Sequence, residues 1–127
     1  MVATASKMKN ILIVEDDEEM MRIYEMMFAD KADYNIEIEG CAEVALRKVK
    51  QKQYELIILD IIMMPMTGDT FYFYLRNSLK TMHIPVLVVT VLDSQVMDHF
   101  KIMQNVDFIQ KPVTEEKLFD KIENMVK

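Results

Sequence analysis

The sequence predicts a single α/β domain made of five βα units, with a five-stranded parallel sheet of strand order 2-1-3-4-5 and helices on both faces. Two observations predict this fold. Short apolar runs alternate along the 127 residues with segments of helical periodicity, and three of the five runs are apolar at every position. Continuously apolar runs are typical of strands covered on both sides, whereas alternating runs fit half-exposed strands. The order 2-1-3-4-5 has three central strands and two edge strands, which matches that division.

The five strands are assigned from their composition. The continuous runs Ile11–Val14, Leu56–Leu59 and Val86–Val89 are rich in β-branched residues and are expected to be central. The runs Tyr34–Glu39 and Val106–Gln110 alternate apolar with polar residues and are expected at the edges. Parallel neighbours need crossover helices, which are almost always right-handed.

Five helices are expected between and after these strands, because apolar residues recur there at the spacing of an amphipathic helix. The stripes are Met20, Ile23, Tyr24, Met27 and Phe28; Ala42, Ala45, Leu46 and Val49; Phe71, Tyr74, Leu75 and Leu79; Val96, Phe100 and Met103; and Leu118, Ile122, Met125 and Val126. Thr114 favours the start of the last helix, since its hydroxyl can cap free N–H groups.

Composition limits the classes of protein. With 51% hydrophobic and 28% charged residues the chain is globular, and we expect an N-terminal tail over residues 1–9 and one domain over residues 10–127. The formal charge of −6 argues against direct nucleic-acid binding. A single cysteine excludes an intrachain disulfide and a cysteine-based zinc cluster. No apolar run approaches the ~20 residues of a membrane helix and no signal peptide is visible, so we expect a cytoplasmic protein without membrane contact.

Charged and hydroxyl side chains follow four of the predicted strands. Glu15 and Asp16 follow the first strand, Asp60 follows the third, Thr90 ends the fourth and Lys111 follows the fifth. In such sheets, ligands bind beyond the carboxyl ends of the strands, where the strand order reverses. Converging carboxylates repel one another, and a divalent cation relieves this; oxygen ligands favour Mg²⁺ or Mn²⁺ over zinc.

This combination of groups indicates phosphoryl transfer. A lysine ammonium and a threonine hydroxyl at the same edge can bind the oxygens of a phosphoryl group held on the metal. An aspartate carboxylate can itself be the nucleophile and form an aspartyl phosphate.

Four segments carry a resemblance to a known family: ILIVEDD, YELIILD with the MP and G that follow, IPVLVVT and DFIQKP. In this order they resemble the receiver domain of two-component response regulators, chemotaxis receivers included, over essentially the whole chain. The spacing also fits, since Asp60 lies 44 residues after Asp16, Thr90 lies 30 after Asp60 and Lys111 lies 21 after Thr90. The resemblance implies a (βα)5 flavodoxin-like fold.

The resemblance assigns a role to each polar residue of the cluster. Asp60 matches the phosphoacceptor and also a ligand of the metal. Asp16 matches a direct Mg²⁺ ligand, Glu15 an acid that acts through a bound water, and Ile62 the residue whose backbone carbonyl binds the metal. Thr90 and Lys111 match the hydroxyl and the ammonium that bind the phosphoryl group.

The resemblance also implies a conformational switch and partners. Thr90 and Phe108 match the switch residues, which would couple Asp60 to a surface formed by the fourth helix, the fifth strand and the fifth helix. The Lys111–Pro112 peptide bond matches one that is usually cis. The implied partners are a histidine kinase or phosphotransfer protein and a downstream protein. The chain would be a signalling domain rather than an enzyme, with Mg²⁺-dependent self-phosphorylation and slow autodephosphorylation.

Two other functions stay open. A receiver-like adaptor would keep the fold and signal without phosphorylation. A Mg²⁺-dependent phosphatase would use Asp60 as a turnover nucleophile, but such enzymes generally need a second acid close by, and Ile62 occupies its usual place.

Three features depart from the family pattern. The proline expected four residues after Asp60 stands one residue later, as Pro65. Val91 occupies a position that is normally small, so we expect slow phosphorylation, slow loss of phosphate, or both. Asn105 and Val106 stand where receivers commonly carry glycine and alanine.

Overall fold

The computed structural model describes residues 8–91 and 105–126 and contains one sheet of five parallel strands in the order β2-β1-β3-β4-β5. This confirms the predicted fold and order. The elements are β1 (Lys9–Val14), α1 (Glu18–Phe28), β2 (Tyr34–Glu39), α2 (Ala42–Gln51), β3 (Leu56–Leu59), α3 (Gly68–Arg76), β4 (Val86–Thr90), β5 (Val106–Gln110) and α5 (Glu115–Met125). The helix predicted around Val96, Phe100 and Met103 lies outside the described residues. The division of the chain after residue 9 stays a prediction.

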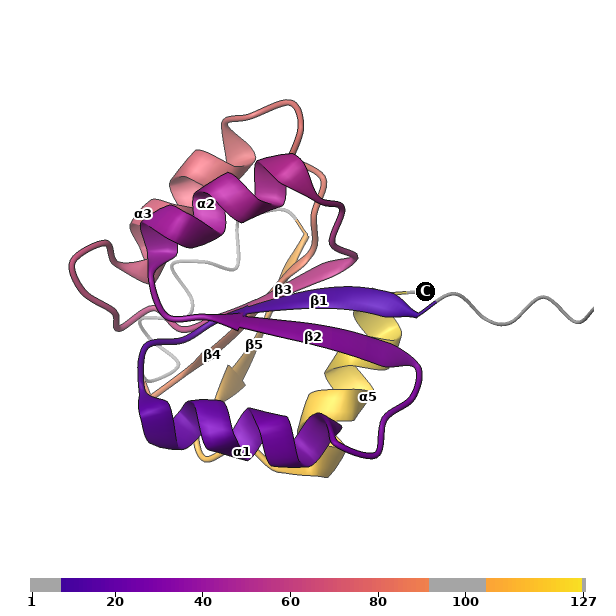
Figure 1. Cartoon of the computed structure of the whole chain (residues 1–127). Helices are drawn as coiled ribbons and strands as arrows, with labels where there is room; N and C mark the ends of the chain where they lie inside the picture. Colours follow the sequence, from indigo (N-terminus) through magenta and orange to yellow (C-terminus); the bar gives the residue numbers. More distant parts are fainter. Residues whose placement is uncertain (1–7, 92–104, 127) are drawn as a thin grey trace, which may run out of the picture.

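Helices cover both faces of the sheet (Figure 1), with α2 and α3 on one side and α1 and α5 on the other. The strands sort their side chains accordingly, because successive residues of a strand point to opposite faces. In β1, Leu12 and Val14 pack on the side of α2 and α3, whereas Ile11 and Ile13 pack on the side of α1 and α5. The central strands are therefore buried on both faces, as their apolar composition predicts.

The edge strands are less buried, also as predicted. In β2 no residue is fully buried, and in β5 Ile109 alone is. Side chains fix the helix starts: Asp17 caps α1 by accepting from the Met20 N–H at 2.9 Å, and Thr114 caps α5 by accepting from the Lys117 N–H at 3.2 Å. Among the described residues no helix is long and apolar enough to cross a membrane.

The buried stripe predicted for the third helix is partly wrong. In α3 the buried residues are Gly68, Phe71, Tyr72 and Leu75, whereas Tyr74 and Leu79 are exposed. The helix ends before Leu79, because the Asn77 side chain donates to the Phe73 carbonyl at 2.7 Å and satisfies the end of the helix. The buried face is thus rotated by about one residue towards Tyr72.

Arg76 ties the end of α3 to the amino ends of β4 and β5. Its guanidinium donates to the Ile84 carbonyl at 2.7 Å and to the Asn105 carbonyl at 3.0 Å, and it also donates to the Tyr72 hydroxyl at 3.1 Å. Asn105 has a φ of 58°, and its side chain donates to the His83 carbonyl at 2.8 Å. Asparagine tolerates this left-handed conformation better than most residues. Asparagine therefore suits this position, where the family resemblance led us to expect glycine.

We expect Asn105→Val to lower the free energy of unfolding by about 2 kcal/mol, since a β-branched residue is strained at positive φ. Asn105→Gly is expected to change it much less, because glycine adopts this φ freely and only the side-chain hydrogen bond is lost. Urea unfolding followed by circular dichroism measures both. Equal losses in the two variants would contradict a backbone origin.

A second set of polar contacts joins β2 to the loop that follows α2. The Tyr54 hydroxyl donates to Glu37 Oε2 at 2.6 Å, and the Lys52 ammonium pairs with Glu37 Oε1. The hydrogen bonds from Lys52 and Tyr54 lower the pKa of Glu37 below its usual value of 4.5. Because the folded-state pKa is depressed, ionised Glu37 stabilises the fold above pH 4.5, and this contribution is lost as the pH falls through the folded-state pKa.

We expect Glu37→Gln to lower the free energy of unfolding by about 1 kcal/mol at pH 7, with a smaller deficit at pH 3.5. Urea unfolding at both pH values measures this difference. Glu25→Gln, which alters an exposed glutamate in the middle of α1, is the matched control. The same deficit at both pH values would show that the charge of Glu37 is not the cause.

Candidate phosphoacceptor site at the carboxyl ends of the strands

Four neighbouring strands bring the predicted polar residues to one edge of the sheet. Glu15 directly follows β1, Asp60 directly follows β3, Thr90 is the last residue of β4 and Lys111 directly follows β5. These strands are consecutive in the sheet. Residues separated by up to 96 positions in sequence are thereby brought into contact, as the parallel order predicts.

The centre of the site is the Lys111 ammonium, which contacts two carboxylates. Lys111 Nζ lies 3.2 Å from Glu15 Oε1 and 3.4 Å from Asp60 Oδ2. Both acids are buried: Glu15 is 1% exposed and Asp60 7%. The geometry thus joins three of the predicted site residues in one group.

The group lacks one positive charge, because two carboxylates share one ammonium. Burial, and after it the charge of Asp60, raise the pKa of Glu15 from 4.5 to about 7, although Lys111 and the Asp17 N–H oppose the shift. Glu15 is therefore partly protonated near neutral pH. A cation near these oxygens would stabilise the ionised form.

Asp16 and Ile62 lie beside this group, although Asp16 is turned towards the β3–α3 loop. The exposed Asp16 accepts from the Met64 N–H through Oδ2 at 3.4 Å. Ile62 donates its N–H to Asp60 Oδ1 at 3.1 Å. Within the described ranges, no three acidic, histidine or cysteine side chains are arranged to hold a metal ion. The oxygen donors suit Mg²⁺ by their chemistry, and the ligand set of Glu15, Asp16, Asp60 and Ile62 stays a prediction.

Gly68 sets the path of the loop after Asp60. A Cβ at this position would lie 2.3 Å from the Asp60 carbonyl oxygen, so only glycine allows α3 to begin so close to β3. The Gly68 N–H donates to the Ile61 carbonyl at 2.9 Å. In the sequence, only the motif around Gly68 indicated a special role for it. Its φ is not positive, so glycine is required here by the close approach of the Asp60 backbone and not by an unusual backbone conformation.

Two prolines of the site follow cis peptide bonds. The Lys111–Pro112 bond is cis, which confirms the prediction from the resemblance. The Met64–Pro65 bond is also cis, and this was not predicted. The contact of the Met64 N–H with Asp16 was missed as well, because nothing in the loop sequence indicates which backbone groups face the acids.

The two residues predicted to form the switch lie on the neighbouring strands β4 and β5, two residues apart in register, since Thr90 pairs with Gln110. Thr90 is fully buried, and its carbonyl accepts from the Lys111 N–H at 2.8 Å. Phe108 pairs in register with Val88 and packs, partly buried, against the core on the side of α2 and α3. Thr90 is thus linked to Lys111 by a backbone hydrogen bond, and Phe108 belongs to the strand that Lys111 directly follows.

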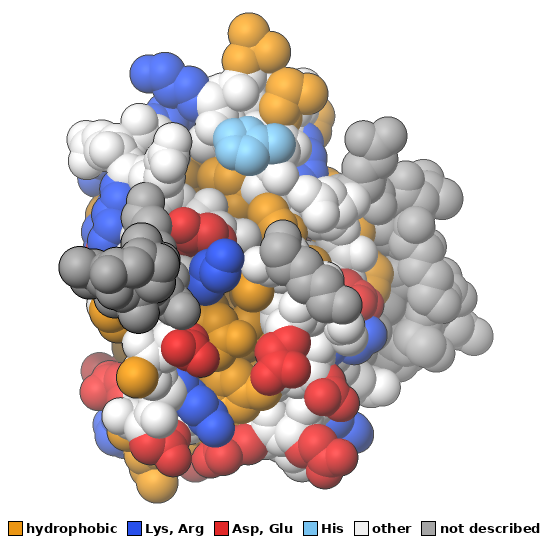
Figure 2. Space-filling view, turned by 90° about the vertical axis from the view of Figure 1, so that its right-hand side faces the viewer, with side chains coloured by type: hydrophobic (Ala, Val, Ile, Leu, Met, Phe, Trp, Pro, Cys, Tyr) orange, Lys and Arg blue, Asp and Glu red, His pale blue; other side chains and the backbone are white. Residues whose placement is uncertain are grey.

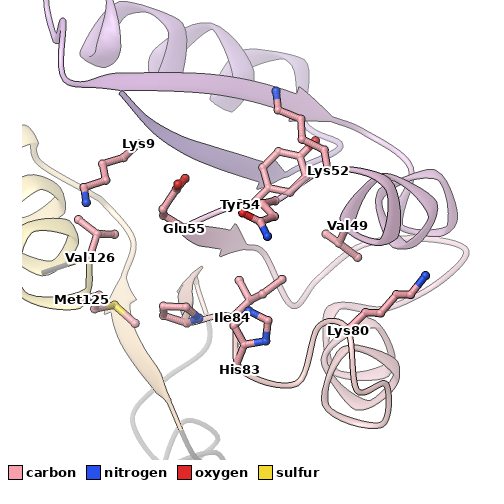
Figure 3. Close-up of a pocket in the computed structure, with 12 residues that line it drawn as sticks. Lys9, Val49, Lys52, Tyr54, Glu55, Lys80, His83, Ile84, Met125 and Val126 are labelled. Atoms are coloured by element: carbon pink, nitrogen blue, oxygen red, sulfur yellow. The ribbon is translucent and has the colours of Figure 1, made fainter. Parts of the chain in front are cut away.

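A separate pocket of about 400 Å³ lies at the opposite, amino-terminal ends of the strands (Figure 3). Its lining includes Lys9, Lys52, Glu55 and Lys80. Lys52 pairs with Glu37, and Figure 3 shows the amino groups of Lys52 and Lys80 pointing in different directions. The face around it carries mixed charges (Figure 2), with acidic side chains gathered towards α1 and α5. This pocket does not contribute to the carboxylate site.

Comparison with known proteins places the chain in a family. Residues 11–123 match the response regulator receiver domain. The chain is 31% identical over 117 residues to the response regulator ArlR of Staphylococcus epidermidis, which covers 91% of this chain and 51% of that protein. It is 30% identical to histidine kinase P4 of Formosa agariphila, of which it spans 9%. The chain thus spans about half the length of the first relative, 51%, and only 9% of the second.

Solved structures share the fold. The chemotaxis response regulator CheY4 of Vibrio cholerae has a TM-score of 0.84 at 23% identity, covering 94% of this chain and 99% of that chain. The receiver domain of the sensor histidine kinase PA1611 of Pseudomonas aeruginosa, with a magnesium ion coordinated in its active site cleft, has a TM-score of 0.81 at 19% identity and covers 94% of this chain and 98% of that chain. The family match over residues 11–123, most of the chain, shows that the chain belongs to the response regulator receiver domains of two-component signalling.

Proposed function

We propose that this domain accepts a phosphoryl group on Asp60 from a phosphohistidine of a histidine kinase or phosphotransfer protein. The observation that carries the proposal is the contact of Lys111 Nζ with Asp60 Oδ2 at 3.4 Å and Glu15 Oε1 at 3.2 Å in a buried group at the sheet edge. Family membership supports it, because the matched region contains every residue of that group.

The transfer needs mainly orientation and neutralisation of charge. An Asp60 carboxylate oxygen attacks phosphorus, the N–P bond of the phosphohistidine breaks, and the imidazole leaves. The Ile62 N–H on Oδ1 and Lys111 on Oδ2 fix the orientation of the carboxylate before attack. The Thr90 hydroxyl and the Lys111 ammonium then bind oxygens of the new aspartyl phosphate.

Mg²⁺ is the proposed cofactor, with Mn²⁺ as a substitute, held by Glu15, Asp16, Asp60 and the Ile62 carbonyl. The cation would neutralise the phosphoryl oxygens and the excess of carboxylates. Two observations support this: the pKa of Glu15 is raised to about 7 by burial and by the neighbouring Asp60, and the PA1611 receiver holds a magnesium ion in its active site cleft.

Phosphorylation would act by shifting a pre-existing equilibrium between two conformations. Thr90 and Phe108 would move together and alter the surface of the fourth predicted helix, β5 and α5, to which a downstream protein would bind. A groove of about 420 Å³ runs along part of this surface and is lined by Phe108, Lys117 and Lys121 among others. The aspartyl phosphate would then hydrolyse slowly. The domain would therefore work as a signalling protein rather than as an enzyme, and we expect it to act in the cytoplasm.

A receiver-like adaptor that signals without phosphorylation is the second candidate. It is favoured by one observation, that Asp16 faces the Met64 N–H rather than the other two acids. A phosphatase is disfavoured, because Ile62 stands where a second acid would be needed.

With Mg²⁺ and acetyl phosphate, we expect one phosphoryl adduct on Asp60, detected by intact-mass and peptide mass spectrometry. Asp60→Asn and chelation with EDTA are expected to abolish it, because they remove the nucleophile and the cation. Asp33→Asn, which changes an exposed aspartate before β2, is the matched control and should be labelled like the wild type.

The other outcomes of this experiment identify the alternatives. No adduct from acetyl phosphate or from any tested kinase would favour the adaptor. Continuous release of phosphate from phosphate esters would identify a phosphatase.

We expect Val91→Ala to increase the rates of phosphorylation by acetyl phosphate and of phosphate loss several-fold. Val91 directly follows Thr90 and is exposed, whereas Asp60 is only 7% exposed, so a smaller side chain would open access to the carboxylate. Mass-spectrometric time courses measure both rates, with Met26→Ala on α1 as the control at an exposed apolar residue. Unchanged rates would remove Val91 as a determinant of access.

A further inference from the structure

Tyr24 is a buried phenol that takes no part in the proposed phosphoryl transfer. It is 1% exposed and lies in the middle of α1, among the apolar residues that this helix packs against the sheet. A phenylalanine would fill nearly the same space, and burying a hydroxyl without a hydrogen-bond partner costs free energy. The Tyr24 hydroxyl is therefore expected to have a partner.

The direction of α1 points Tyr24 towards the carboxyl edge of the sheet. The helix begins at Glu18, at the edge where β1 ends (Figure 1). Side chains of a helix lean towards its amino end. Tyr24 lies one turn after Met20 on the buried face of α1. Its ring therefore extends towards the acids at this edge rather than away from them.

Glu15, Asp60 and Lys111 extend from the face of the sheet that Tyr24 covers. Their backbone N–H groups donate to carbonyls of the neighbouring strands, so the strand pairing continues to all three residues. Side chains two positions apart in a strand share a face. The residues two positions earlier all belong to the core cluster that contains Tyr24, and they are Ile13, Ile58 and Ile109. Tyr24 thus lies on the inner side of the charged group.

The charges of the site act on the Tyr24 hydroxyl. Burial, then the charge of Glu15 and then that of Asp60, raise the pKa of Tyr24 above its usual value of 10.0. The phenol is therefore neutral at pH 7 and can donate its proton in a hydrogen bond. Of the two acids, Glu15 has the larger effect on the hydroxyl.

The Tyr24 hydroxyl is in contact with water. No hydrogen bond joins it to another residue of the ranges 8–91 and 105–126. In the same ranges no completely enclosed side-chain nitrogen or oxygen lacks a partner. The small exposed part of Tyr24 therefore includes its hydroxyl. A water molecule bound there can also donate to a carboxylate, because first-shell waters commonly bridge two polar groups.

We propose that Tyr24 is a positioning residue of the phosphoacceptor site, whose hydroxyl acts through one water molecule to hold the Glu15 carboxylate in the orientation that binds the cation. Lys111 Nζ lies 3.2 Å from Glu15 Oε1, and the Asp17 N–H donates to Glu15 Oε2 at 3.3 Å. Two carboxylate oxygens accept about four hydrogen bonds, so a further donor has room. The inference rests on the proposed function in one respect, that Mg²⁺ binds at Glu15.

Titration of the chain with MgCl₂, followed by NMR amide shifts, tests the proposal. Tyr24→Phe is expected to weaken Mg²⁺ binding about fivefold, because it removes one hydrogen-bonded link to a charged group and keeps the shape of the core. Tyr34→Phe is the matched control and should bind Mg²⁺ like the wild type, since Tyr34 is partly buried at the start of β2, at the opposite edge of the sheet.

Equal Mg²⁺ affinities of the wild type and Tyr24→Phe would overturn the proposal and leave the proposed function standing. The same holds if Tyr34→Phe weakens binding as much as Tyr24→Phe does. A wild type that binds no Mg²⁺ would overturn the proposed cofactor and this inference with it.

A double-mutant cycle separates an action through Glu15 from a general effect on the core. Glu15→Asp keeps the charge but shortens the side chain by one methylene, which breaks the link to Tyr24. In this background Tyr24→Phe should change the Mg²⁺ affinity by less than about twofold. An undiminished loss would show that Tyr24 does not act through Glu15. Circular dichroism and urea unfolding check that all variants are folded.

Discussion

Two buried carboxylates share one ammonium group at the carboxyl edge of the sheet, and the local structure depends on this shortage of positive charge. Glu15 and Asp60 both contact Lys111, yet the pKa of Glu15 is raised by burial and by Asp60 despite the lysine. Apolar strands surround the acids and reduce their contact with water. Such a group is stabilised by any species that brings positive charge or removes negative charge. A divalent cation would do the first, whereas the phosphoryl group proposed to form a mixed anhydride with Asp60 would add negative charge.

The rigidity of this edge comes from contacts that belong to the fold rather than to the chemistry. Gly68 lets α3 begin against the backbone of Asp60, and a side chain there would displace one of the two. At the other end of α3, Arg76 binds the carbonyls of Ile84 and Asn105. The helix is thus fixed to β3 at its start and to β4 and β5 at its end. A shift of Asp60 or of β5 is therefore expected to displace α3.

The sequence by itself determined the strand order, the central and edge strands, the identity of the polar cluster and the family. These features depend on patterns repeated over many residues: continuous against alternating apolar runs, and motifs in a fixed order. It also indicated the cap at Thr114, because capping depends on a few adjacent residues. The orientation of α3 was partly missed, since four aromatic residues in succession, Phe71 to Tyr74, give no clear periodicity.

Only the tertiary structure decided how the groups meet. Lys111 lies within hydrogen-bonding distance of both Glu15 and Asp60, Asp16 turns to the Met64 N–H, and Asn105 takes a positive φ while holding the His83 carbonyl. Each of these depends on distances between segments far apart in the chain, which no local pattern encodes. The residue types at the strand ends predicted which groups come together. The packing of helices and loops determines which atoms are in contact and which side chains are exposed.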